Sequence, residues 1–280
     1  MSGLAVVLAL ASSVAWGSAD FSGGLLSRRL PTIAVTVISQ AAGFAALLVA
    51  LAIHGGALDS RSFAIGLAAG AGGGVGLAAF YRALAVGTMS IVSPIVACGA
   101  VVPFAISLAT GERPSTLALA GALVALAGAV LASVEERRAA AKERGRAIVL
   151  AAAAAVALGC FTYFLGLGSR EGSGLSTLVG ARIGSLTLLL VLTAALGATL
   201  RVGRPNVLPV AAVGLCDVGA NVLFALASTH GLLAIVSVLG SLYPVTTVVL
   251  AHLVLRERLT AVQLAGVVVA LAGIAVMSVG

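Results

Sequence analysis

The sequence predicts an all-α polytopic membrane protein with ten transmembrane helices in two inverted five-helix repeats. Three observations predict this fold. Of the 280 residues, 61% are hydrophobic and 9% are charged, whereas a soluble domain carries about 25% charged residues. Ten apolar stretches are each long enough to cross a bilayer, which takes about 20 residues. The second half of the chain also repeats the first.

Short polar connections separate the ten apolar stretches. The stretches run near 3–22, 33–53, 62–82, 90–110, 116–134, 147–167, 175–197, 207–228, 233–254 and 261–279. Ten helices of this length leave little chain for a soluble domain. We therefore expect a first five-helix repeat over 1–134, a charged cytoplasmic linker over 135–146 and a second five-helix repeat over 147–280.

The internal repeat is clearest in the last helix of each half. GALVALAGAVLAS (121–133) and GVVVALAGIAVMS (266–278) share seven of thirteen residues at an offset of 145. The offset becomes 144 and then 142 toward the start of each half. Because each half has five spans, an odd number, the halves must cross the membrane in opposite directions. Transporters with such inverted repeats bind their substrates near the midplane, at the interface of the halves.

The distribution of basic residues in the loops predicts the orientation. Twelve Lys and Arg residues lie in the connections on one side of the predicted bundle, and three lie on the other. Cytoplasmic loops carry the excess of Lys and Arg. We therefore expect a multi-pass protein of the cytoplasmic (inner) membrane with both termini outside.

Arg182 and Asp217 are ionisable residues inside predicted spans. Such residues are rare in membranes and face a cavity, a partner or a pathway. The two lie in consecutive spans, so an ion pair is plausible, and Asn221 follows Asp217 by one helical turn. We expect all three in or beside a central cavity, in contact with a substrate or a coupled proton. The alternative is a salt bridge and an amide that only hold helices together.

Five further residues are candidates for substrate binding. Asp20 ends the first span and is either a cavity carboxylate or a solvated group at the interface. Trp16 is the only tryptophan and lies mid-span rather than at the interface where tryptophans often anchor. Tyr81, Tyr163 and Tyr243 also lie within or at the end of spans, where a buried phenol needs a polar partner.

Two repeated features favour structural roles. Gly66, Gly70 and Gly74 recur at a spacing of four and predict a ridge for close helix packing. They do not form the GxGxxG pattern of a dinucleotide site. Glu112 and Glu257 lie in equivalent turns, where we expect them to cap helices or lock loops.

The chain resembles the drug/metabolite transporter superfamily, in particular its ten-helix type with two EamA-like repeats. The resemblance rests on LASSVAWGSADFSGGLLSRRLP near the start and on the segments FYRALAVGTMSIVSPI and STHGLLAIVSVLGSLYPVTTVVLAHLVLRERLT in the two halves. Relatives often carry an Arg early in the second helix of a repeat; Arg182 matches, whereas the first half has Gln40. The resemblance implies transport of a small metabolite or drug, often export.

We therefore expect a secondary transporter that works by alternating access, with a small-molecule substrate and the lipid bilayer as partners. Coupling to a proton or another ion and the oligomeric state are left open. A membrane scaffold or a subunit of a lipid-translocating complex is the alternative, and an intramembrane lipid-modifying enzyme is less favoured because no acid, base or metal cluster appears. We expect no enzyme activity, no cofactor, no metal and no nucleic-acid partner.

Overall fold

The computed structural model describes residues 2–54, 57–86, 92, 95–132, 141–255 and 260–279, and those residues contain helices and no strand. This confirms the predicted all-α class. The helices are α1 (Gly3–Ser27), α2 (Thr32–His54), α3 (Ser60–Val86), the short 3₁₀ turn η1 (Cys98–Ala100), α5 (Val101–Ala109), α6 (Thr116–Ala132), α7 (Ala141–Glu171), α8 (Gly174–Ala195), α9 (Arg204–His230), α10 (Leu233–Gly240), α11 (Tyr243–Leu255) and α12 (Ala261–Val279).

The described helices account for ten apolar segments. Seven are long and apolar enough to cross a membrane, and three are shorter, Ile95–Ala109, Thr116–Ala132 and Ala261–Val276. The fold is therefore the predicted polytopic one of two inverted five-helix repeats. Parts of the expected segments lie outside the described residues, among them 90, 91, 93 and 94 of the span expected over 90–110, and 135–140 of the expected linker. Glu257 also lies outside them.

The ninth span differs from its prediction because it is not one continuous helix. It divides into α10, which ends at Gly240, and α11, which begins at Tyr243. Pro244 has no N–H for an intrahelical bond, and its ring would clash with the carbonyl group four residues earlier, that of Gly240. The break places Ser241 and Tyr243 at a turn in the middle of the bundle.

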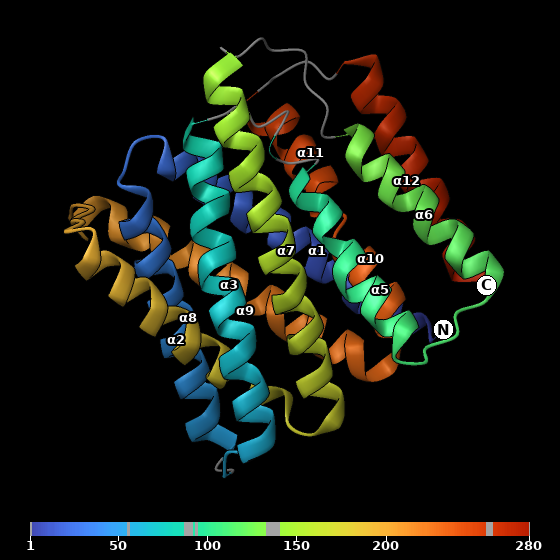
Figure 1. Cartoon of the computed structure of the whole chain (residues 1–280), viewed down its shortest axis with the longest axis horizontal. Helices are drawn as coiled ribbons and strands as arrows, with labels where there is room; N and C mark the ends of the chain where they lie inside the picture. The colour runs from blue at the N-terminus through green and yellow to red at the C-terminus, as the bar shows by residue number, and fades with distance from the viewer. Residues whose placement is uncertain are drawn as a thin grey trace.

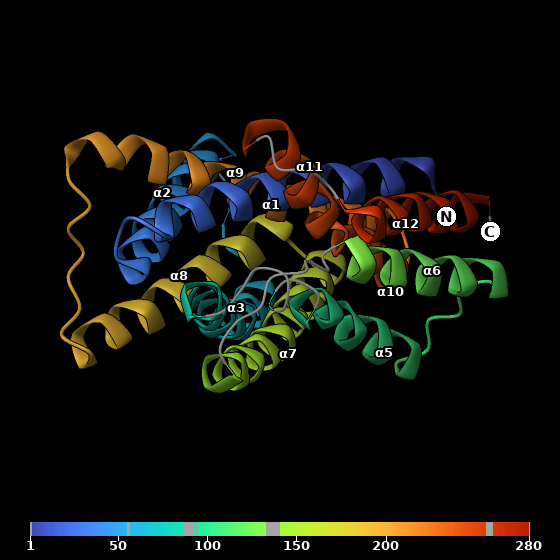
Figure 2. The same cartoon turned by 90° about the horizontal axis from the view of Figure 1, so that it is seen from above.

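The helices form two interlocked groups, which Figure 2 shows as two layers. α1 packs chiefly along α9, and α3 packs along α7. Under the repeat, α1 corresponds to α7 and α3 to α9, so each group takes helices from both halves of the chain. α6 and α12, the last helices of the two repeats, pack along each other at one end of the bundle (Figure 1).

Glycines permit close helix approaches at two equivalent points. A Cβ atom on Gly70 in α3 would lie 2.1 Å from the carbonyl oxygen of Ala181, and one on Gly214 in α9 would lie 1.8 Å from that of Ser39. Both distances are well inside van der Waals contact. The ridge of Gly66, Gly70 and Gly74 faces α8, which confirms its helix-packing role.

Glu112 connects the start of α10 to the end of α7. Its Oε1 and Oε2 atoms accept hydrogen bonds from the backbone N–H groups of Leu233 (2.9 Å) and Ala234 (2.8 Å), at the start of α10. The same carboxylate pairs with Arg170 at the end of α7. A carboxylate at a helix N-terminus satisfies unpaired N–H groups and interacts favourably with the helix dipole. The expected capping role of Glu112 is confirmed.

Candidate substrate-binding cavity

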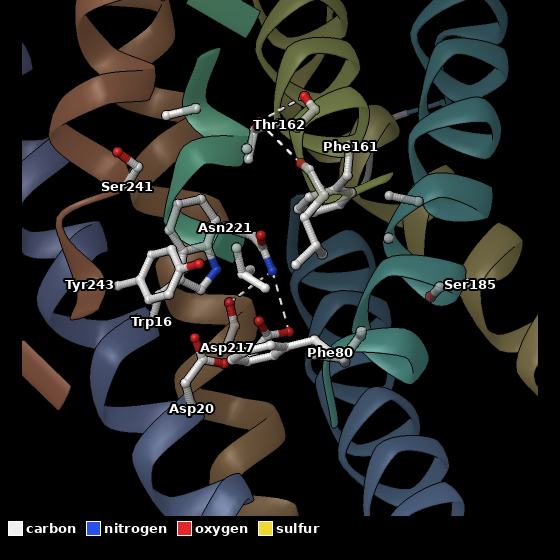
Figure 3. A pocket seen from close by; sticks show the side chains of 18 of the residues that line it. Trp16, Asp20, Phe80, Phe161, Thr162, Ser185, Asp217, Asn221, Ser241 and Tyr243 are labelled. Carbon is white, nitrogen blue, oxygen red and sulfur yellow. Dashed lines mark hydrogen bonds between the residues drawn. The ribbon is translucent and has the colours of Figure 1, made fainter. Parts of the chain in front are cut away.

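A cavity lies between the two groups of helices, with an empty volume of about 920 Å³ that includes its opening to solvent. One side, the α1/α9 wall, carries Trp16, Asp20, Asp217, Asn221, Ser237, Ser241 and Tyr243. The opposite side, the α3/α7 wall, carries Gly73, Leu77, Phe80, Val96, Gly99, Ala100, Leu158, Gly159, Phe161 and Thr162. Gln40 from α2 and Leu178, Ala181, Arg182 and Ser185 from α8 complete the lining. Figure 3 shows the labelled side chains of both walls.

Arg182 and Asp217 form an ion pair in this cavity. Nη2 of Arg182 lies 2.6 Å from Oδ2 of Asp217, and the side chains are 6% and 22% exposed. Nη1 of Arg182 donates to Oε1 of Gln40, which also accepts a bond of 3.1 Å from the Ser185 hydroxyl. A buried guanidinium with two acceptors offsets part of its desolvation cost. Both terminal nitrogens of Arg182 therefore already donate hydrogen bonds to protein groups.

The repeat explains why Gln40 meets Arg182. The two residues are 142 positions apart, the offset that relates the early helices of the two halves. α2 and α8 are therefore equivalent helices, and they contact each other in the bundle. Equivalent positions near a pseudo-twofold axis come together. The sequence identifies Gln40 as the counterpart of Arg182 but does not indicate a role for it.

Asn221 is oriented by Asp217. Its Nδ2 atom donates to the backbone oxygen of Asp217 (2.8 Å) and lies 3.4 Å from Oδ2 of the same residue. Because both neighbours are acceptors, the amide nitrogen must face them. Oδ1 of Asn221 is then left buried without a partner among the described residues, and so is the hydroxyl of Ser237.

Asp20 has different surroundings. It lines the cavity beside Asp217 and has no hydrogen bond or ion pair with the described residues. Trp16 lies one turn before it on α1 and packs against Phe224, with ring centroids 5.3 Å apart. In Figure 3 the rings of Trp16 and Tyr243 border the space next to Asp20. The cavity thus combines aromatic rings with an unpaired carboxylate.

The sequence profile of one family matches residues 3–134 and 145–279, nearly the whole chain. The chain belongs to the EamA-like transporter family. A search of curated proteins found no match. A solved crystal structure of another protein superposes over 100% of this chain and 98% of that chain, with a TM-score of 0.82 and 18% identity; at this identity the likeness shows the fold alone. The family assignment makes the protein a membrane transporter of small molecules.

Two of the predicted site residues of this EamA-like protein lie outside the cavity lining. Tyr81 is buried at 2% exposure and packs against Phe80, with ring centroids 5.8 Å apart. Tyr163 packs against Phe164. On α7 the residues that line the cavity are Leu158, Gly159, Phe161 and Thr162. At about 100° per residue, Tyr163 falls outside the arc of the helix that these four residues span. Tyr163 therefore takes a different direction.

Other lining residues gave no signal in the sequence. Phe80, Phe161 and Leu158 look like ordinary lipid-facing or core residues of an apolar helix. Ser241 lies in a helix break that was not expected from the sequence, and Ser237 lies one turn before it in α10. The described residues contain no group of three or more His, Cys, Asp or Glu that could hold a metal ion.

Proposed function

We propose that this EamA-like protein is a secondary transporter that exports a small metabolite or drug-like molecule across the cytoplasmic membrane. The observation that carries the proposal is the cavity between two repeat-related helix groups, with a buried ion pair at its centre. A pathway through lipid needs polar groups that face each other rather than the bilayer. The aromatic and polar lining suits a small amphipathic molecule.

The mechanism we propose is alternating access. In an inverted repeat, two related elements exchange roles around a fixed site. Here the equivalent pairs α3/α8 and α2/α9 are not packed alike: α3 and α8 contact each other more extensively. The glycines at 66 and 74 that permit this have Val210 and Val218 as counterparts in α9. This difference in packing supports the view that the structure is one of two states. In the second state α2 and α9 would pack as closely as α3 and α8 do here.

In this proposal Trp16, Asp20, Arg182, Asp217, Asn221 and Tyr243 contact the substrate or the coupled ion. The sequence has no nucleotide-binding motif, so the energy comes from a proton or other ion gradient or from the substrate's own gradient. We further propose that the segment over 135–146 faces the cytoplasm and that both termini lie outside. To test the orientation, a cysteine is introduced at each terminus of the protein and labelled from outside intact cells. Protection of both cysteines from the reagent would overturn the proposed orientation.

Uptake by proteoliposomes tests transport. The purified protein is screened against a panel of metabolites and cationic drugs, and each transported solute is measured again with Asp217→Asn. We expect uptake to fall at least tenfold, because Arg182 then loses its charged partner in the cavity. Glu171→Gln is the matched control, since Glu171 pairs with Arg61 at the surface, 2.7 Å away, where ion pairs contribute little. Unchanged uptake by Asp217→Asn would remove this residue from the mechanism, and no uptake of any solute would favour a scaffold.

A further inference from the structure

We infer that the substrate is a small organic cation with hydrogen atoms on its charged nitrogen, a protonated amine, that binds at Asp20 between aromatic rings. This inference rests on the proposed function and narrows it to a substrate class. It follows from the charges, the unpaired hydrogen-bonding atoms and the rings of the cavity.

One ionisable group of the lining has no partner. Among the residues that line the cavity, Asp20 and Asp217 are acidic and Arg182 is basic. Arg182 pairs with Asp217, whereas Asp20 has no cationic partner among the described residues. A carboxyl group away from water is neutralised by a proton or by a cation, and a cation that binds at Asp20 replaces that proton. A ligand that brings one positive charge supplies that partner and makes the occupied cavity neutral.

The unpaired polar atoms of the cavity can accept hydrogen bonds from a ligand. Oδ1 of Asn221 accepts hydrogen bonds only, and the residue is 2% exposed; the hydroxyl of Ser237, at 4% exposure, can accept as well as donate. Both residues line the cavity. A buried polar atom that makes no hydrogen bond has lost its hydration without compensation. An ammonium group has several N–H donors to offer, whereas a quaternary nitrogen has none.

The aromatic rings of the cavity suit a cation as well. Trp16, Tyr243, Phe80 and Phe161 all line the cavity. The face of an aromatic ring attracts a cation within about 6 Å, and tryptophan is the strongest. The same rings provide an apolar surface for the carbon skeleton of the ligand. A small aromatic or aliphatic amine therefore matches both parts of the lining.

A carboxylate ligand fits less well. Arg182 is the cationic group of the lining, and its side chain is 6% exposed with Asp217 and Gln40 already on its two terminal nitrogens. An anion would have to displace one of these partners and would approach the unpaired Asp20. Like charges at this range repel, and the low dielectric of the site strengthens the repulsion.

The fluorescence of Trp16 tests the inference without any need for transport. Trp16 is the only tryptophan of the chain, so the emission of the purified protein reports on the cavity alone. Three probes of similar size are titrated: protonated 2-phenylethylamine, neutral 2-phenylethanol and anionic 3-phenylpropanoate. We expect a saturable change with the amine, and at least tenfold weaker binding of the alcohol and the anion. N,N,N-Trimethyl-2-phenylethylammonium should bind more weakly than the primary amine, because it cannot donate to Asn221.

Variants locate the binding. Asp20→Asn is nearly isosteric, and we expect it to raise the Kd of the amine at least tenfold while leaving that of the alcohol within twofold. Ser237→Ala should raise the Kd of the amine by a smaller factor, and Glu171→Gln should leave both Kd values unchanged. Equal or tighter binding of 3-phenylpropanoate would overturn the inference, as would an unchanged amine Kd in a folded Asp20→Asn protein. Amine binding without uptake by proteoliposomes would instead refute the proposed transport, and only the binding of a protonated amine at Asp20 would stand.

Discussion

The two walls of the cavity are built on equivalent backbones but carry different chemistry. Positions 16, 20, 217 and 221 of the α1/α9 wall correspond to 158, 162, 73 and 77 of the α3/α7 wall at the repeat offsets of 142 and 144. Trp, Asp, Asp and Asn on one wall thus face Leu, Thr, Gly and Leu on the other. The related pair Gln40 and Arg182 lies between them.

This contrast separates what the repeat requires from what the substrate requires. The helix pairs and the glycine crossings at Gly70 and Gly214 occur in both halves, because two interlocked groups need the same close contacts. The carboxylates and the amide are confined to one wall, so nothing in the scaffold demands them. We therefore assign recognition to the α1/α9 wall and shape to the α3/α7 wall.

The largest expected effect comes from removing the charged centre. Asp217→Ala leaves Arg182 buried without its carboxylate, and breaking a buried pair costs about 3–5 kcal/mol. Changing Arg182 to Gln as well copies the residue of the equivalent position, Gln40, and should restore most of the stability but not uptake. Thermal unfolding in detergent measures the first effect and proteoliposome uptake the second. A single Asp217→Ala variant as stable as the parent would show that the pair does not hold the walls together.

The helix crossings should respond alike in both halves. Gly70→Ala and Gly214→Ala each place a methyl group against a backbone carbonyl oxygen, 2.1 and 1.8 Å away before any movement, and overpacking of this kind costs about 1–3 kcal/mol. The matched control is Gly219→Ala, also in α9, where a Cβ would meet nothing within 4 Å. That change should stabilise the helix by up to about 1 kcal/mol. Equal melting temperatures for Gly214→Ala and Gly219→Ala would refute the close crossing.

The smallest effect concerns the residues that directly precede α3 and α9. Asp59 directly precedes α3, and hydrogen bonds from the side chain and backbone N–H of Ser62 lower its pKa below the ordinary value of 3.8. The equivalent residue before α9 is Gly203, which has no side chain to cap the helix. Asp59→Gly should therefore lower the melting temperature slightly at neutral pH.

The pH dependence of that difference follows from the sign of the shift. A carboxylate whose folded pKa is lowered stabilises the protein above its unfolded pKa, and this contribution is lost as the pH falls through the folded value. The melting temperatures of Asp59→Gly and the parent should converge in strongly acidic detergent solution. A difference that grows on acidification would contradict the capping role.

Much of the fold was predictable from the sequence because a bilayer requires long apolar helices and the repeat is visible in the residues themselves. The ion pair of Arg182 and Asp217 was also predictable, since an ionisable residue within lipid needs a partner. Ser237 and Ser241 were missed because their exposure to the cavity depends on the break before Pro244. Tyr81 and Tyr163 were expected at the site, but the rotation of a helix decides which of two neighbouring residues faces inward. A uniformly apolar helix, as α7 is around Phe161, does not reveal that rotation in its sequence.

Access to the cavity from the two sides of the membrane tests the central claim most directly. Cys98, Cys160 and Cys216 are replaced by alanine, and Ser241→Cys then places one thiol in the α1/α9 wall. A membrane-impermeant thiol reagent is applied to right-side-out and to inside-out vesicles. We predict labelling from both sides, with each reduced by a saturating transported solute. Labelling from one side only, unaffected by any solute, would contradict a cavity that opens alternately to the two sides.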